Sequence, residues 1–268
     1  MDIKKLGLIA GKGKLPVLVA NAAKEKAIEI ISIAFTEQIG DELRPFSQKV
    51  YHYGVGQAEK IINTLKQEGV EYVIILGKVD KGIIFNKFSF DWRALKSLGR
   101  IRSGSDESLF SAIKEELGKD GLKLLDQTLF LQDYLAKKGV LTSRRPTNKE
   151  WQDVEFGFQI AKEIGRLDIG QTIVVKDRTV LAVEAIEGTD EAIRRGCHFS
   201  NGNAVVVKVS RPHQDFLLDA PTVGSQTIET MKEGRASVLA LEAGKTLIVD
   251  LAKMIYQADL ANIAIVGI

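Results

Sequence analysis

Hydrophobic positions in the first half of the chain form short β-rich runs, and segments with helical spacing separate these runs. The predicted strands are 6–10, 30–35, 49–53 and 72–76, and the predicted helices between them are 15–26 and 57–68. Strands that alternate with helices form parallel sheets, because each helix returns the chain to the edge where the next strand begins. The pattern therefore predicts an α/β fold with an N-terminal, Rossmann-like open parallel sheet.

The rest of the chain has a more mixed pattern. Further helices are predicted at 92–98, 106–117, 128–136, 149–166, 190–195, 226–232 and 251–258. Further strands are predicted at 172–176, 179–183, 204–209, 237–241, 246–249 and 262–266. Asp177 and Arg178 join two of these strands closely enough to predict a hairpin. The polar segment 142–148 marks a domain boundary, which gives a first domain over 1–142 and a second, mixed α/β domain over 143–268.

Composition agrees with two compact domains. The chain has 268 residues, 45% of them hydrophobic, and 37 basic residues against 35 acidic ones give a net charge of +2. This charge is too small to gather nucleic acid by itself. The one cysteine, Cys197, excludes an internal disulfide framework and a cysteine-rich zinc site. No apolar run approaches the roughly 20 residues that span a bilayer, and no signal peptide is recognisable, so we expect a soluble, cytoplasmic protein.

Three loops of the first domain are candidates for holding a nucleotide. Gly11 and Gly13 lie between the first strand and the helix that begins at Leu15, where backbone amides can hold a phosphate oxygen. The loop lacks the third glycine of a dinucleotide fingerprint and the ending of a P-loop, so a bare glycine turn remains an alternative. The other two loops contain Gly77 with Lys78, and Gly104 with Asp106. For these, a solvated lysine and a helix cap are the alternatives.

The second domain contains an acid-rich loop that suits phosphoryl chemistry. Lys208 ends a strand, and Arg211, Asp215, Asp219 and Thr222 follow it in an irregular segment. Phosphoryl transfer uses carboxylates to hold Mg²⁺ or orient water, and it uses basic side chains to neutralise phosphate oxygens. A structural loop in which each aspartate caps a turn is the alternative for either acid alone.

A shorter segment of the second domain adds three candidates of lower rank. Glu187, Thr189 and Asp190 follow an apolar strand and open a helix, and Thr189 or Asp190 could simply cap that helix. Glu187 lies where a strand delivers side chains to a site, and Glu242 follows another strand in the same way.

Several segments, taken together, resemble one known family. They are Gly7-Leu8-Ile9-Ala10-Gly11-Lys12-Gly13-Lys14-Leu15-Pro16, Val183-Glu184-Ala185-Ile186-Glu187-Gly188-Thr189-Asp190, Gln214-Asp215, Asp219-Ala220-Pro221-Thr222-Val223-Gly224 and Leu239-Ala240-Leu241-Glu242-Ala243-Gly244-Lys245-Thr246. Their order over the whole chain resembles that of UDP-2,3-diacylglucosamine pyrophosphatases of the LpxI type.

The resemblance implies a hydrolase that cleaves UDP-2,3-diacylglucosamine to UMP and 2,3-diacylglucosamine 1-phosphate (lipid X) in lipid A biosynthesis. It also implies a divalent cation, Mg²⁺ or another such as Mn²⁺, and a homodimer in the cytoplasm with at most peripheral contact with the inner face of the inner membrane. Residues 1–142 would bind UDP, and 143–268 would bind lipid X and carry the catalytic acid loop. Asp219 matches the essential aspartate of the family. Phe216-Leu217-Leu218 departs from the family, since many members have an arginine between the two aspartates.

The residues and the resemblance together give a hypothesis about roles. The expected catalytic residues are Asp219, Asp215, Lys208 and Arg211. The two aspartates are also the expected metal ligands, and the two basic residues offset phosphate charge. The expected substrate-binding residues are Gly11, Gly13, Leu15, Gly77, Lys78, Gly104, Asp106, Glu187, Thr189, Asp190, Gln214 and Thr222. The alternative function is a non-catalytic UDP-sugar or lipid-binding protein. An NAD-dependent oxidoreductase is disfavoured, because the second strand ends without the acid that holds a ribose hydroxyl.

Overall fold

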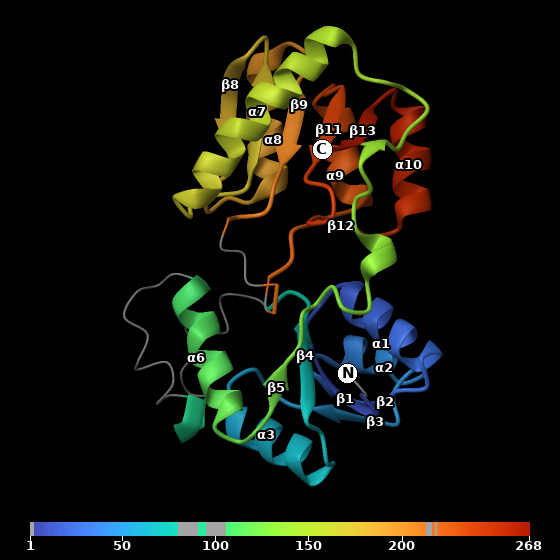
Figure 1. Ribbon diagram of the computed structural model, residues 1–268, viewed down its shortest axis with the longest axis vertical. Helices are drawn as coiled ribbons and strands as arrows, with labels where there is room; N and C mark the ends of the chain where they lie inside the picture. The colour runs from blue at the N-terminus through green and yellow to red at the C-terminus, as the bar shows by residue number, and fades with distance from the viewer. Residues whose placement is uncertain (1–2, 80–90, 95–105, 213–215, 218) are drawn as a thin grey trace. The chain divides into compact units, whose positions relative to one another are not determined.

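A computed structural model of the chain describes residues 3–79, 91–94, 106–212, 216–217 and 219–268 (Figure 1). The chain forms two compact units. The first contains Met1–Leu131 together with Phe216–Asp219, and the second contains Gln132–Asp215 and Ala220–Ile268. The segment Phe216–Asp219 thus belongs to the first unit, although the chain before and after it belongs to the second.

The first unit is built on a five-stranded sheet in the order β3-β2-β1-β4-β5, and its pairings are parallel. Its strands are β1 (Lys5–Ala10), β2 (Glu29–Ala34), β3 (Lys49–His52), β4 (Tyr72–Leu76) and β5 (Lys123–Leu124). The order reverses between β1 and β4, and this is the switch point beside which open α/β sheets bind ligands. The predicted Rossmann-like parallel sheet is therefore confirmed.

Helices pack on this sheet and bury its hydrophobic side chains. They are α1 (Leu15–Glu25), α2 (Glu37–Leu43), α3 (Ala58–Gln67) and α6 (Asp106–Gly118). Ile31, Ile33 and Val73 of the sheet form a core cluster with Ile61 and Leu65 of α3. The short helix α2 was not predicted, because it has too few apolar positions to show a helical period. The predicted helix 92–98 is described only over 92–94.

The helix predicted at 128–136 is wrong. The carboxylate oxygen Oδ1 of Asp126 accepts hydrogen bonds from the backbone N and the hydroxyl of Thr128, at 2.7 and 2.6 Å. These bonds fold the chain into a turn, and only the short 3₁₀ segment η2 (Gln132–Tyr134) follows. Local side-chain bonds of this kind compete with helix formation, and the apolar spacing alone did not reveal them.

The second unit contains a six-stranded mixed sheet in the order β6-β13-β11-β9-β7-β8. Its strands are β6 (Gly139–Val140), β7 (Thr172–Lys176), β8 (Thr179–Val183), β9 (Val205–Lys208), β11 (Val238–Leu241) and β13 (Ala264–Gly267). The strand β11 runs parallel to β9 and β13, whereas β6, β7 and β8 make antiparallel pairs. A separate small pair joins β10 (Thr222–Val223) to β12 (Leu247–Ile248). The predicted hairpin and the mixed α/β class are confirmed.

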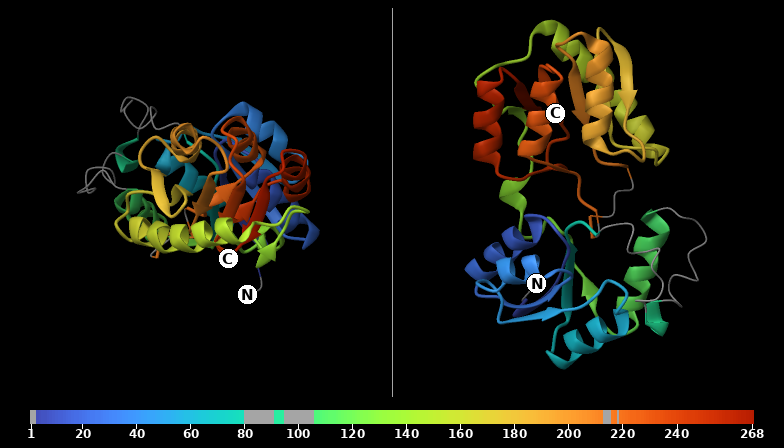
Figure 2. Two further views of the ribbon diagram at one scale, coloured as in Figure 1. Left: turned by 90° about the horizontal axis from the view of Figure 1, so that it is seen from above. Right: turned by 180° about the vertical axis from the view of Figure 1, so that it is seen from behind.

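Four helices cover the two faces of this sheet (Figure 2). They are α7 (Asn148–Arg166), α8 (Thr189–Ser200), α9 (Ser225–Glu233) and α10 (Leu251–Leu260). Val154 of α7 packs with alternate sheet residues such as Ile173 and Val205. The other sheet face, with Val174, packs against α8, α9 and α10, and a Cβ added to Gly196 of α8 would lie only 2.4 Å from the side chain of Val174. Residues of β7 and β9 therefore point alternately to α7 and to α8.

The division between the units lies earlier in the chain than residues 142 and 143. It falls between Leu131 and Gln132, and β6, which precedes residue 142, pairs with β13 of the second unit.

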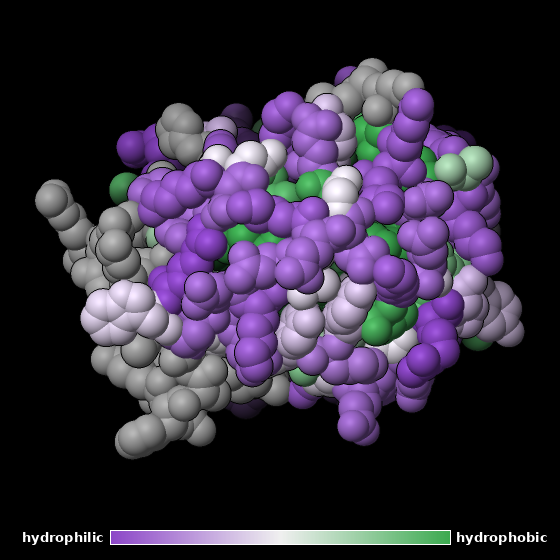
Figure 3. All heavy atoms as spheres, turned by 90° about the horizontal axis from the view of Figure 1, so that it is seen from below, coloured by the Kyte–Doolittle hydropathy of each residue, from purple (hydrophilic) through white to green (hydrophobic). Residues whose placement is uncertain are grey.

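In the part of the chain that the structure describes, no helix is long and apolar enough to cross a membrane. Figure 3 shows a face on which hydrophilic residues cover most of the described surface, with small separate hydrophobic spots between them.

Candidate functional site

The loops that follow β1 and β4 are bonded to each other through their backbones. The N–H of Gly11 donates to the carbonyl of Leu76 at 2.7 Å. Lys12 and Lys78 exchange two backbone hydrogen bonds, at 2.9 and 2.8 Å. A Cβ on Gly11 would lie 2.6 Å from the carbonyl oxygen of Lys78, and one on Gly77, whose φ is +94°, would lie 2.6 Å from backbone atoms of Gly11. Both glycines are thus needed for the close approach of the two loops.

The space beside Gly13 in the first loop is open. Gly13 has a φ of +113°, and a Cβ built on it would have no atom within 4 Å. The helix α1 begins at Leu15, and Lys14 at its N-cap provides no side-chain cap. Orphan amides at such a helix start can hold a phosphate oxygen. The structure thus brings Gly11, Gly13, Leu15, Gly77 and Lys78 together at the switch point.

A buried glutamine connects the segment of Asp219 to the same sheet. Gln127 is 5% exposed, and its side-chain nitrogen Nε2 donates to the carbonyl of Ile75 in β4 at 2.6 Å. The backbone N–H of Gln127 donates to the carbonyl of Phe216 at 2.9 Å. The segment Phe216–Asp219 is therefore anchored beside the end of β4. The sequence analysis missed Gln127, because its neighbours Asp126 and Thr128 are also polar and the three together read as a solvated turn.

Some predicted site residues are not placed. Gly104, Gln214 and Asp215 lie outside the described residues, and Asp106 is the first residue of α6.

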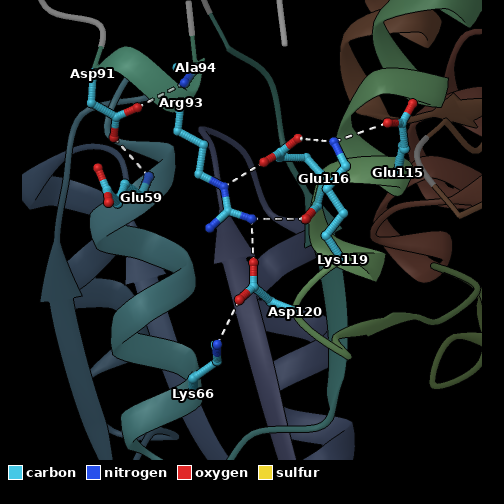
Figure 4. A network of polar contacts seen from close by, with 9 residues as sticks. All are labelled: Glu59, Lys66, Asp91, Arg93, Ala94, Glu115, Glu116, Lys119 and Asp120. Atoms are coloured by element: carbon cyan, nitrogen blue, oxygen red, sulfur yellow. Dashed lines mark hydrogen bonds and ion pairs between the residues drawn. The ribbon is translucent and has the colours of Figure 1, made fainter. Parts of the chain in front are cut away.

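A short helical stretch that precedes Gly104 in the chain is held by polar contacts (Figure 4). The carboxylate of Asp91 accepts hydrogen bonds from the backbone N–H groups of Glu59 and Ala94, at 2.7 and 2.8 Å.

Charged side chains in Figure 4 attach this stretch to α6. Arg93 pairs with Glu116 and with Asp120, and Asp120 also pairs with Lys66 of α3 at 2.6 Å. The ammonium of Lys66, and then the guanidinium of Arg93, hold the pKa of the Asp120 carboxyl below its ordinary value. This network attaches the stretch 91–94 to α3 and to the end of α6.

The clearest cluster of the second unit lies where β8 and β9 end, and it consists of two buried charged side chains and a half-buried threonine. Lys208 is 4% exposed, and its ammonium donates to the hydroxyl of Thr189 at 2.7 Å. The same hydroxyl donates to the carboxylate oxygen Oε1 of Glu184 at 2.8 Å. The structure thus joins two predicted residues, Lys208 and Thr189, to a third that the sequence analysis did not select.

The other residues of the 185–190 segment shape the turn before α8. Glu187 pairs with Arg195, and it accepts a hydrogen bond from the backbone N of Ala185 at 3.1 Å. Hydrogen bonding to its own backbone N–H, followed by the Arg195 guanidinium, lowers the pKa of the Glu187 carboxyl. Asp190 lies in the first turn of α8, and Gly188 with a φ of +85° precedes this helix. Cys197 of α8 is buried, and burial raises the pKa of its thiol to about 11.

The start of the acid-rich loop is held by a second, half-buried acid. The carboxylate of Glu242 accepts from the backbone N and the hydroxyl of Ser210, at 2.7 and 2.8 Å, and pairs with Lys162 at 3.0 Å. Arg211 pairs with Asp168 at 2.8 Å. Further along, Thr222 donates its hydroxyl to the carbonyl of Ala220 at 2.9 Å. These contacts anchor both ends of the loop that carries the two aspartates.

Within the described ranges, no group of three or more histidine, cysteine, aspartate or glutamate residues could hold a metal ion. Asp219 is described and Asp215 is not, so their pairing as ligands stays a prediction. Mg²⁺ commonly binds through one or two carboxylates together with water and substrate phosphates. Two carboxylates, those of Asp219 and Asp215, would be enough for such an ion.

Comparison with known families decides the classification. Residues 5–134 match the family model "LpxI N-terminal domain", and residues 137–266 match "LpxI C-terminal domain". The chain belongs to the LpxI family. This confirms the resemblance found in the sequence. A relative from Caulobacter vibrioides, UDP-2,3-diacylglucosamine pyrophosphatase LpxI, is 31% identical over 280 residues, which cover 99% of this chain and 98% of that protein.

Solved structures resemble the chain only weakly. N5-carboxyaminoimidazole synthetase from Staphylococcus aureus is 14% identical with a TM-score of 0.28, and the match covers 77% of this chain and 47% of that one. UDP-glucose 4-epimerase from Bifidobacterium longum, in complex with NAD⁺ and UDP, is 11% identical with a TM-score of 0.26, and the match covers 42% of this chain and 34% of that one. Neither similarity supports a conclusion about function.

Proposed function

We propose that this LpxI-family chain hydrolyses the pyrophosphate bond of UDP-2,3-diacylglucosamine and releases UMP and lipid X in lipid A biosynthesis. The observation that carries the proposal is the match over 99% of the chain to the Caulobacter pyrophosphatase. The two sets of strand-end residues support it independently, because one set offers backbone donors for a diphosphate and the other offers buried charge.

The first unit would bind the UDP moiety. Its support is the position of Gly13 and Leu15 at an uncapped helix start beside the switch point. The amides of the first turn carry a partial positive charge that suits a phosphate. Gly11 and Gly77 act indirectly, since they allow the loops after β1 and β4 to meet. Lys78 adds a cationic side chain at the same place.

The second unit would bind the phosphate of lipid X and neutralise charge on the pyrophosphate. The support is Lys208, a buried ammonium held by Thr189, together with Arg211 at the start of the acid-rich loop. A cation in a site shielded from water stabilises developing phosphate charge more strongly than one in bulk water. Gln214, Thr222, Glu187 and Asp190 remain proposed substrate contacts, as do Gly104 and Asp106.

Asp219, with Asp215, would hold a divalent cation, Mg²⁺ or Mn²⁺. When bound, such an ion polarises phosphoryl oxygens and lowers the pKa of a coordinated water. The anchoring of the segment Phe216–Asp219 by Gln127, beside the end of β4, supports a role for Asp219 next to the proposed nucleotide loops. We also propose that the protein is a cytoplasmic homodimer with at most peripheral membrane contact, and that it has no nucleic-acid partner.

The test uses purified protein, UDP-2,3-diacylglucosamine and Mg²⁺. We expect stoichiometric release of UMP and lipid X, loss of release in EDTA, and restoration by Mg²⁺ or Mn²⁺. Asp219→Asn should bind the substrate and lower kcat by at least about 10³-fold, since the residue is proposed to act on the reacting centre. Asp133→Asn, an exposed change in the same protein, is the matched control and should keep full activity.

Two outcomes would contradict the proposal. Full activity of Asp219→Asn would remove the residue from the reaction. Tight binding of lipid X without UMP release under any divalent metal would favour the alternative, a non-catalytic UDP-sugar or lipid-binding protein.

A further inference from the structure

Glu184 is a buried acid to which the proposed mechanism gives no role. It follows β8 directly, and it is 8% exposed. Its oxygen Oε1 accepts a hydrogen bond from Thr189 at 2.8 Å. Its other oxygen, Oε2, is buried and has no hydrogen-bond partner among the described residues. A buried carboxylate with half of its acceptor capacity unused is costly unless a cation lies nearby.

The nearby cation is Lys208, one hydroxyl away. The ammonium of Lys208 donates a hydrogen bond to the Thr189 oxygen at 2.7 Å, and the Thr189 hydroxyl in turn donates a hydrogen bond to Glu184. A hydroxyl has one hydrogen and two lone pairs, so this arrangement fixes the direction of both bonds. Thr189 therefore cannot donate the same hydrogen to a substrate phosphate. It acts as a bridge between a buried anion and a buried cation.

Four structural elements converge on this bridge. Lys208 ends β9, Thr189 starts α8, and Glu184 follows β8. Thr172 of β7 pairs with Lys208 in the antiparallel register and so points to the same face of the sheet. The hydroxyl of Thr172 is also buried without a hydrogen-bond partner among the described residues. Polar groups that a fold leaves unsatisfied in this way commonly mark a functional site.

Stability alone does not explain these charges. Apolar residues of similar size are often equal to or better than a buried ion pair in folding free energy. The neighbouring positions on the same sheet face, such as Val174 and Val206, are apolar and fully buried. The same sheet face therefore has valines in the middle of β7 and β9 but Thr172 and Lys208 at the strand ends. The proposed site at these ends best explains the difference.

We propose that Glu184 is a positioning residue that acts through Thr189 to hold the Lys208 ammonium in place and directed at the phosphate of the substrate. This inference rests on the proposed role of Lys208 in phosphate neutralisation. Glu184 itself touches neither the substrate nor the reacting atoms in this account.

The first experiment compares steady-state kinetics of substitutions along the bridge. Glu184→Gln keeps the acceptor for Thr189 but removes the charge, and it should lower kcat by about 10- to 100-fold while KM changes less than about threefold. Thr189→Val removes the hydroxyl at constant shape and should lower kcat similarly. Thr189→Ser should retain a larger share of kcat, because the hydroxyl is kept. Glu163→Gln, in a surface pair with Arg166, is the matched control for loss of one glutamate charge.

The second experiment is a double-mutant cycle with Lys208→Met. If Glu184 acts through Lys208, adding Glu184→Gln to Lys208→Met should lower kcat by less than about twofold further. If the fold-losses in kcat of the two single variants multiplied in the double variant, the inference would be overturned. An unchanged kcat in Lys208→Met would also overturn it.

Urea unfolding of the same four proteins tests the bridge without reference to activity. Glu184→Gln should lower the urea midpoint in the wild-type background and leave it nearly unchanged in the Lys208→Met background. Equal shifts in both backgrounds would overturn the pairing. If the wild-type chain releases no UMP, the proposed function fails, and this unfolding cycle still decides whether Glu184 and Lys208 are coupled.

Discussion

The strand ends of the two sheets build their candidate sites in opposite ways. In the first unit, the loops after β1 and β4 meet through backbone hydrogen bonds, and Gly11 and Gly77 leave room for the contact. In the second unit, β8 and β9 end in buried side-chain charges, Glu184 and Lys208, which Thr189 joins. The first arrangement is sensitive to an added Cβ atom, and the second is sensitive to a removed charge.

This contrast suits the two halves of the proposed substrate. A nucleoside diphosphate can be held by amides, which keep their geometry whatever the side chains are. A sugar phosphate at a reacting bond needs charge that is shielded from water. The segment Phe216–Asp219 belongs to the first unit, while the chain before and after it belongs to the second.

The strongest test of the contrast is Gly77→Ala. Its φ is +94°, and the new Cβ would lie 2.6 Å from backbone atoms of Gly11. We expect a loss of about 3–4 kcal/mol in the free energy of unfolding, from backbone strain and overpacking together. Gly69→Ala, with a φ of +70° and open space around it, is the control and should cost only about 1–2 kcal/mol. If urea unfolding showed the same loss of free energy for both variants, the close approach of the two loops would not contribute to stability.

Glu242→Gln tests the second unit by removing a charge. The change leaves Lys162 without its acidic partner and weakens the two hydrogen bonds from Ser210. We expect a loss of about 2 kcal/mol in the free energy of unfolding, as for hydrogen bonds to a charged group. The loss should be measurable by urea unfolding. Glu229→Gln, in the surface pair with Lys232, should change the free energy by less than about 0.5 kcal/mol.

Gln127→Leu tests the anchor of the Asp219 segment. The substitution removes the part-buried hydrogen bond from Nε2 to the carbonyl of Ile75. We expect a loss of about 1–2 kcal/mol and a lower kcat, since Asp219 is held less firmly. Gln38→Leu, at an exposed site on α2, controls for the change of side chain. A fully active Gln127→Leu protein would remove Gln127 from the positioning of this segment.

The smallest expected effect concerns pH. Lys66 and Arg93 lower the pKa of the Asp120 carboxyl below its ordinary value of 3.8. A group whose pKa is lowered in the folded state stabilises the fold above the unfolded pKa, and it loses this contribution as the pH falls through the folded pKa. Asp120→Asn should therefore unfold at lower urea than the wild type at pH 7, and the difference should shrink below pH 3.8. A difference that stays constant with pH would contradict this electrostatic account.

Hydrophobic runs were enough to predict most strands, because buried positions on both faces of a sheet leave a continuous apolar signal, as at Tyr72–Leu76. They could not predict that the backbones of Lys12 and Lys78 would pair, since that depends on the register of strands distant in sequence. Gln127 and Glu184 were missed for a related reason. A polar residue next to an apolar run has the same appearance whether it is solvated or buried, and only tertiary contacts distinguish the two.

The resemblance to the LpxI family came from motifs rather than from periodicity. The segments around Gly11, Glu187 and Asp219 identify it in order along the chain, and the family models match both halves. The roles of individual residues did not follow in the same way. Thr189 was selected as a substrate contact, whereas its hydroxyl is occupied by Glu184 and Lys208.

The most direct test of the proposed function is hydrolysis in ¹⁸O-labelled water. Purified protein, UDP-2,3-diacylglucosamine and Mg²⁺ should yield UMP and lipid X in equal amounts, and mass spectrometry should find one ¹⁸O atom in the phosphate of lipid X, as expected for attack of water on the β-phosphorus. If ¹⁸O appeared in UMP instead, the protein would still be a hydrolase, but water would attack the α-phosphorus. Intact substrate after long incubation with saturating protein and metal would contradict the account.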